Sequence, residues 1–158
     1  MIGKGLLAAA LAGIAIAGCG GGGFNDNGGS LRGFLSSGDW IVGNGFYADR
    51  YIMRSTRTGD VSIDMSSNEL DAYLVVIDEF GNSIEDDDSG PGSDAQLTFW
   101  AESGREYEVR ATSFDAQDTG RYELFWSPGL RFSEELRGRG KEGALKDTAT
   151  RPPKKQGN

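Results

Sequence analysis

The stretch Val61-Ser62-Ile63-Asp64-Met65 alternates apolar and polar side chains, and this period of two decides the fold class. Successive side chains of a β-strand point to opposite faces, so the alternation predicts a strand with one buried face. The same pattern recurs in Leu97-Thr98-Phe99, Tyr107-Glu108-Val109-Arg110-Ala111 and Tyr122-Glu123-Leu124-Phe125-Trp126. Each of these stretches is therefore predicted to be a half-buried strand.

Turn sequences rich in glycine separate the predicted strands. They are Thr58-Gly59-Asp60, Glu79-Phe80-Gly81-Asn82, Ser89-Gly90-Pro91-Gly92, Ser103-Gly104 and Thr119-Gly120. Roughly seven short strands at this spacing, without a convincing amphipathic helix, predict an all-β fold. We expect an antiparallel β-sandwich of jelly-roll type, and the 158 residues leave room for one such domain.

The chain is expected to divide into four segments, of which residues 31–128 form the sandwich. Residues 1–18 are a signal peptide, and residues 19–30 are a lipidated cysteine with a glycine-rich linker that behaves as flexible coil. Residues 129–158 are expected to be a disordered basic tail, because they contain little apolar surface. Its cations are either simply solvated or form an arm that binds phosphate or docks on the protein itself.

Residues Ile16-Ala17-Gly18-Cys19 resemble the bacterial lipobox, in which small residues precede a cysteine that receives a diacylglyceryl group. Lys4 and the apolar stretch behind it have the length of a cleaved leader, too short for a stable membrane anchor. Cys19 is therefore predicted to carry lipid and to hold the protein at the membrane of the cell envelope. The alternative is an ordinary Sec signal with an incidental cysteine. By analogy with Gram-negative sorting, Gly20 favours the outer membrane.

The charge of the chain excludes several classes of function. The formal net charge is −8, and residues 19–130 alone carry −13. Such an acidic body repels phosphate backbones, so no nucleic-acid partner is expected. The chain has no histidine and one cysteine, which excludes Ser-His-Asp, Cys-His and zinc-histidine chemistry as well as an intrachain disulfide.

A series of strand and turn sequences across residues 31–127 resembles the bacterial pre-peptidase C-terminal domain. The stretches are Leu31-Arg32-Gly33, Asp39, Tyr47-Ala48-Asp49-Arg50-Tyr51, Gly59 to Met65, Leu70-Asp71-Ala72-Tyr73-Leu74, Asp78-Glu79-Phe80-Gly81-Asn82, Asp86-Asp87-Asp88, Ser103 to Arg110 and Thr119 to Leu124. The resemblance implies a small jelly-roll-like sandwich without a catalytic role, usually appended to a secreted peptidase and often removed on maturation. Related modules bind extracellular matrix, sometimes with calcium. This chain departs from that pattern, because a lipid anchor is predicted where the peptidase would be.

Acidic residues supply the candidate metal site. Asp86, Asp87 and Asp88 follow one another, with Asp71 upstream, and calcium prefers six to eight oxygen ligands. The spacing is not that of an EF-hand. The alternative is a solvated turn in which the aspartates hydrogen-bond local backbone amides, with Asp71 bracing it. No cofactor other than calcium is expected.

Two aromatic side chains supply the candidate binding surface. If Leu97 and Phe99 face the core, Trp100 points outward, and Phe125 does so if Leu124 faces the core. Exposed aromatic rings are typical of contact with sugar, peptide or protein, although they also cover the edges of sandwiches.

These features favour a non-catalytic module for binding or adhesion, displayed on a lipid anchor at the cell envelope, with an extracellular polymer or an envelope protein as partner. The first alternative is an accessory or chaperone-like subunit of a secreted peptidase. A hydrolase that uses paired carboxylates is the weaker alternative, because a small sandwich offers little cleft in which to tune an acid.

Overall fold

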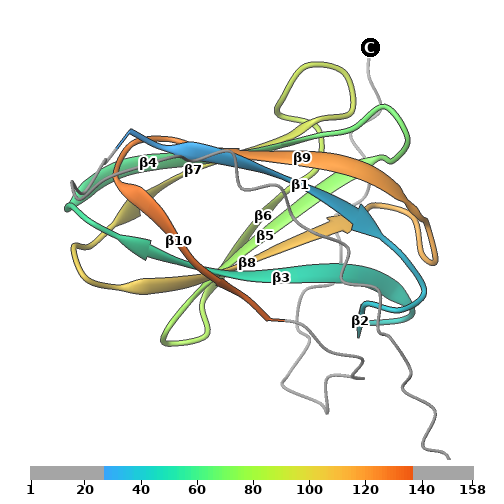
Figure 1. Ribbon diagram of the computed structural model, residues 1–158, viewed down its shortest axis with the longest axis horizontal. Coiled ribbons are helices and arrows are strands. Elements are labelled where there is room, and N and C mark those ends of the chain that lie inside the picture. Colours follow the sequence, from blue (N-terminus) through green and yellow to red (C-terminus); the bar gives the residue numbers. More distant parts are fainter. Residues whose placement is uncertain (1–26, 137–158) are drawn as a thin grey trace, which may run out of the picture.

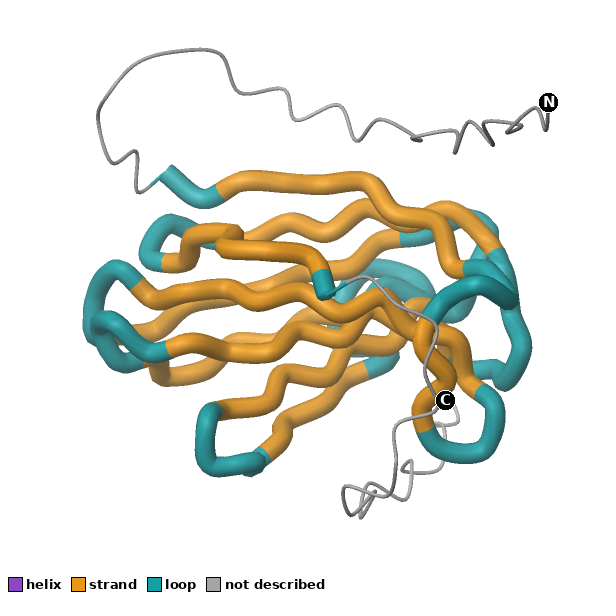
Figure 2. Tube along the Cα trace, turned by 60° about the horizontal axis from the view of Figure 1, so that its bottom comes forward, coloured by secondary structure: helices purple, strands orange, loops and turns teal. Residues whose placement is uncertain are grey.

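A computed structural model describes residues 27–136, and ten β-strands make up most of this range (Figure 1). The strands form two antiparallel sheets that face each other as two layers. Figure 2, from another direction, shows the strands running side by side with loops at both ends. The predicted all-β antiparallel sandwich is confirmed. No helix in the described range is long and apolar enough to span a membrane.

The smaller sheet has the order β1-β9-β4-β7, with β1 Gly29–Leu35, β9 Gly120–Trp126, β4 Gly59–Ser66 and β7 Ala95–Ala101. The larger sheet has the order β10-β3-β8-β5-β6, with β10 Leu130–Glu135, β3 Phe46–Ser55, β8 Glu106–Ser113, β5 Ala72–Asp78 and β6 Ser83–Asp86. The short strand β2 (Trp40–Val42) pairs with β3. Both β2 and β10 therefore lie along β3, on the side away from β8.

The predicted alternation is reproduced in the burial of each strand. Val61, Ile63 and Met65 of β4 are at most 2% exposed, whereas the polar residues between them lie on the outer face. Strands β7, β8 and β9 coincide with the other three predicted strands. The four stretches thus form strands for the expected reason, which is burial of one apolar face between the sheets.

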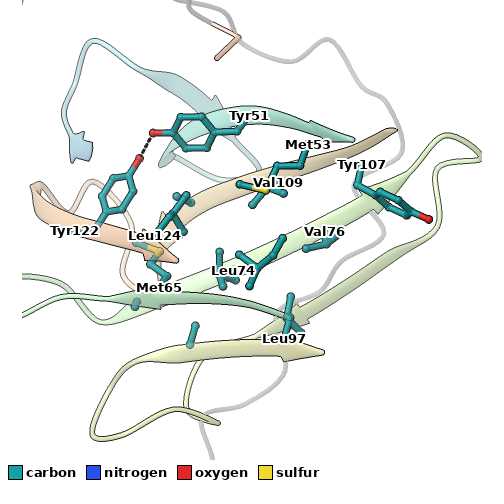
Figure 3. Close-up of a cluster of buried hydrophobic side chains, with 14 of the residues drawn as sticks. Tyr51, Met53, Met65, Leu74, Val76, Leu97, Tyr107, Val109, Tyr122 and Leu124 are labelled. Carbon is teal, nitrogen blue, oxygen red and sulfur yellow. Dashed lines mark hydrogen bonds between the residues drawn. The ribbon is translucent and has the colours of Figure 1, made fainter. Parts of the chain in front are cut away.

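The core lies between the two layers and is drawn from both (Figure 3). Met53, Leu74 and Val109 of the larger sheet face Met65 and Leu124 of the smaller one. At one side of this core a buried polar chain joins the sheets. The hydroxyls of Tyr51 and Tyr122 are hydrogen-bonded at 2.5 Å, and the Tyr122 hydroxyl donates to Asp49 Oδ2 at 2.6 Å. Because each buried hydroxyl has at least one hydrogen-bond partner, the apolar layers can close around them.

The domain is longer at both ends than the sequence indicated. Strand β10 lies inside the segment 129–158 that was predicted to be a disordered tail, so this boundary was wrong. Leu130 is 2% exposed and pairs with Ser55, and the Phe132 ring lies 6.2 Å from that of Tyr51. Leu130 and Phe132 stand among charged residues, so the local sequence indicates a strand only weakly. Both side chains nevertheless pack at the edge of the core. Strand β1 likewise starts at Gly29, inside the predicted linker.

A charged cluster covers part of the outer face of the larger sheet. Glu108 on β8 accepts hydrogen bonds from Arg50 on β3 at 2.7 and 2.8 Å and from Arg110 at 2.7 Å. The three side chains are between 13% and 18% exposed. Partial burial raises the pKa of Glu108, but the hydrogen bonds and charges of the two arginines outweigh it and hold this pKa below the ordinary value.

Candidate functional site

A shallow hollow of about 140 Å³ lies at one end of the sandwich. It is formed by the turn between β5 and β6, the end of β7, and the turn between β7 and β8. Its lining residues are Asp78, Glu79, Phe80, Trp100, Glu102, Arg105, Glu106 and Tyr107. Both sheets contribute to it, because β7 belongs to the smaller sheet and β5 and β8 to the larger one.

Phe80 and Trp100 are the most exposed large apolar side chains of the described residues, at 73% and 63%. Both line this hollow. Phe80 stands in a tight turn in which Asp78 accepts hydrogen bonds from the backbone N–H of Phe80 at 2.9 Å and of Asn82 at 2.8 Å. Gly81 has φ of +83°, a conformation that favours glycine. The ring of Phe80 is thus presented to solvent by a turn that its own sequence stabilises.

Burial raises the pKa of Asp78, but the hydrogen bonds from the Asn82 side chain and from the turn amides together outweigh it and lower this pKa. The net pKa lies below the usual range, so this carboxylate is ionised at neutral pH. At neutral pH the Asp78 carboxylate therefore contributes a negative charge to the hollow.

Arg105 connects the two turns. It forms ion pairs with Glu79 on one turn and Glu102 on the other, the latter at 3.2 Å. Its guanidinium carbon lies 5.2 Å from the centroid of the Phe80 ring. The Tyr107 hydroxyl accepts a hydrogen bond from Glu102 N at 3.0 Å. A cation over an aromatic ring, flanked by carboxylates, positions the Phe80 side chain relative to the rest of the hollow.

Four carboxylates and one guanidinium line the hollow, for a formal balance of −3. With two exposed rings beside this charge, the site can accept a group that is flat or cationic, by stacking and by ion pairing. This combination of surfaces is the basis of the function proposed below.

The two aromatic residues predicted as a binding surface, Trp100 and Phe125, share a face of the sheet but do not lie together. Trp100 and Phe125 both lie on the outer face of the smaller sheet, and Phe125 is 40% exposed, as the alternation predicted. Trp100 opposes Asp60 on β4, however, whereas Phe125 opposes Asp64. Four residues along the strand and two strand spacings separate the rings by about 16 Å. They cannot contact one small ligand group together.

Phe80 is the neighbour that Trp100 has instead, and sequence reasoning missed it. Glu79-Phe80-Gly81-Asn82 was interpreted as a turn, which it is, without a role for its aromatic residue. The available signal was a large ring in the middle of a tight turn, where it cannot be buried by its own strand.

The predicted calcium residues lie at the other end of β6, where Asp86 stabilises the turn. Asp86 accepts hydrogen bonds from Ser89 N at 3.0 Å, from Ser89 Oγ at 2.5 Å and from Gln96 N at 2.9 Å. It thus ties β6 to β7 across the gap between the sheets. This is the local bonding expected of a solvated acidic turn.

Asp87 and Asp88 continue this turn beside Asp86. Its pKa is raised by partial burial and then by the charges of Asp88, Asp86 and Asp71. Within residues 27–136 no group of three or more acidic or cysteine side chains is arranged to hold a metal ion. The sequence also predicted lipidation of Cys19, which lies outside the described residues.

No family model and no curated protein matches the chain. Among solved structures, it is similar to the pre-peptidase C-terminal domain of collagenase from Bacillus anthracis, with a TM-score of 0.47 and 18% identity. The match covers 66% of this chain and 90% of that one. It is also similar to CBM35 from Cellvibrio japonicus Abf62, with a TM-score of 0.39 and 12% identity over 67% of this chain and 99% of that one. The first of these is a domain of the kind that the sequence resembles.

Proposed function

We propose that this chain is a non-catalytic binding module, held at the cell envelope by lipid on Cys19. Its ligand site is the hollow between Phe80 and Trp100. The observation that carries the proposal is the position of these two rings, which are the most exposed in the described domain and line the same hollow. Solvent exposure of one ring is ordinary, but two at one hollow mark an interaction site.

The charged residues support the same conclusion. Arg105 joins the two turns through Glu79 and Glu102 and lies over the ring of Phe80, so this ring is held before a ligand arrives. A site that is ordered in advance loses less conformational entropy on binding than a flexible one. The binding partner in this proposal is an extracellular polymer or an envelope protein, for which a lipid-anchored module provides attachment.

Binding of the full chain to an oligosaccharide array and to oligolysine and oligoarginine peptides tests the site. Trp100→Ala and Phe80→Ala should each weaken binding about tenfold, as expected for an aromatic anchor. The matched control is Phe125→Ala, which removes an exposed ring from the same sheet outside the hollow. Equal binding by all three variants would place the ligand elsewhere, and no binding to any probe would contradict the proposal.

The anchor is tested separately in a bacterial host. Metabolic labelling with palmitate should label the wild-type chain, and Cys19→Ser should abolish the label and release the protein from the membrane fraction. Labelling that persists in Cys19→Ser would exclude this cysteine as the lipidated residue.

A further inference from the structure

The charges of the chain are divided between two parts. Residues 27–136 contain 21 acidic and 8 basic residues, a formal balance of −13. The basic C-terminal segment, residues 137–158, contains 7 basic and 2 acidic residues, a balance of +5. Opposite net charges joined in one chain attract each other at low ionic strength.

A cationic side chain can make more kinds of contact in the hollow than at the acidic turn of residues 86–88. Lysine and arginine bind to carboxylates and also to the faces of aromatic rings. The hollow supplies both, because Glu106 lies beside the exposed rings of Phe80 and Trp100. Of the other three carboxylates, Glu79 and Glu102 already pair with Arg105, and Asp78 accepts hydrogen bonds from its own turn. The acidic turn at residues 86–88 supplies carboxylates alone, and Asp86 already accepts three hydrogen bonds there.

The segment starts close enough to reach the hollow. Leu136 N donates to Arg50 O at 2.8 Å and Leu136 O accepts from Trp40 Nε1 at 2.9 Å, which fixes the starting point beside β3. The hollow lies at the level of Met53 on β3, because Met53 pairs with Tyr107 on β8 and Tyr107 pairs with Asp78 on β5. Met53 is three residues along β3 from Arg50. Three strand spacings and three residues correspond to about 17 Å. A chain of 22 residues can extend about 70 Å.

We propose that the basic C-terminal segment docks in cis on the hollow, with a lysine or arginine side chain against Phe80 and Trp100 and paired with Glu102 or Glu106. This inference rests on the proposed function, because it takes the same hollow as the binding site. Single contacts of this kind are weak, but attachment to the same chain supplies a millimolar effective concentration. The ligand class of the site is accordingly a basic peptide, and an outside partner must displace the chain's own segment.

Carbodiimide cross-linking of the purified full chain tests this directly, because it joins amines to carboxylates that are in contact. All eight basic residues of the described domain are arginines, so the nearby amines belong to Lys141, Lys146, Lys154 and Lys155. Peptide mapping distinguishes links from Lys4 or the N-terminal amine. We expect links from the segment to Glu79, Glu102 or Glu106, and their loss in high salt.

The aromatic part of the proposal is tested with two double variants. Phe80→Ala with Trp100→Ala should lower the yield of these links at least about fivefold, because the cation loses its aromatic contacts. Phe34→Ala with Phe125→Ala removes two exposed rings elsewhere and should leave the yield unchanged. Links spread evenly over the acidic residues, or unaffected by loss of Phe80 and Trp100, would overturn the proposal.

An equal mixture of ¹⁴N- and ¹⁵N-labelled chains separates docking in cis from docking on a second copy. Links confined to one isotope support docking in cis, whereas mixed-isotope links overturn it. Replacing the lysines and arginines of residues 137–158 by glutamine should also raise the affinity of the hollow for oligolysine about tenfold. Oligolysine binding without any cross-link would leave the proposed function intact and sink this inference alone.

Discussion

The ring of Tyr122 on β9 lies over Gly33 on β1, its register partner, so closely that a Cβ on residue 33 would be 2.1 Å from Tyr122 Cζ. Gly33→Ala should therefore destabilise the protein by about 2 kcal/mol, because the ring would have to move out of the core. Urea unfolding of the full chain measures this. Ser30→Ala, on the same strand but exposed, is the control and should change stability by less than about 0.5 kcal/mol. Equal stability of both variants would contradict the packing described.

The tyrosine pair should make the protein sensitive to alkali. Burial is the main cause that raises the pKa of Tyr51 and of Tyr122 well above 10, with the charge of Asp49 acting in the same direction on both. The folded state then retains protons that the unfolded state releases, so this stabilisation is complete below pH 10 and is lost as the pH rises further. The unfolding free energy should fall by about 1.4 kcal/mol per pH unit for each tyrosine above pH 10.

Urea unfolding at pH 8, 10 and 11 measures this dependence. The double variant Tyr51→Phe with Tyr122→Phe should be less stable at pH 8, because it loses the bond to Asp49, yet it should fall less steeply with pH. If the unfolding free energy of the variant fell as steeply with pH as that of the wild type, groups other than these tyrosines would cause the loss of stability in alkali.

Glu108 should contribute stability that disappears in acid. Its folded pKa lies below the unfolded value, so the contribution is present above about pH 4.5 and is lost as the pH falls below it. Glu108→Gln should cost about 2 kcal/mol at pH 7, because Arg50 and Arg110 then lie close together without the carboxylate between them. Glu134→Gln, at an exposed position of β10 outside the hollow, is the control. A Glu108→Gln variant with the wild-type acid profile would contradict this role.

Asp86 should stabilise the junction of β6 and β7 more than its neighbours do. Asp86→Ala removes the acceptor of three hydrogen bonds and should lower the unfolding free energy by about 2 kcal/mol. Asp88→Ala is the matched control and should have a small effect. Thermal unfolding of the two variants measures this difference in stability. Equal losses of stability in both would show that the turn does not depend on Asp86.

Calcium binding at Asp71, Asp86, Asp87 and Asp88 stays a prediction. A bound ion would offset the partial burial and the mutual repulsion that raise the pKa of Asp87, and would raise the melting temperature by mass action. The full chain should then melt higher in millimolar calcium than in magnesium, and Asp87→Asn should abolish the difference while Asp115→Asn retains it. Identical melting in both ions would exclude calcium under these conditions.

Much of the fold could be predicted from local alternation. The burial of Val61, Ile63 and Met65 and the outward position of Trp100 follow from the period of two, which is a property of a single strand. Strand β10 could not be predicted in this way, because Leu130 and Phe132 become core residues only when β3 lies beside them.

The sequence by itself determined that the chain forms an antiparallel sandwich, and which face of each predicted strand is buried. Only the tertiary structure decided that Phe80 and Trp100 line one hollow, that Phe125 stands apart from both, and that Tyr122 lies over Gly33. The physical reason is the range of the interactions. Alternation acts between adjacent residues, whereas the meeting of two turns depends on strand order and register, which are set by pairing between distant parts of the chain.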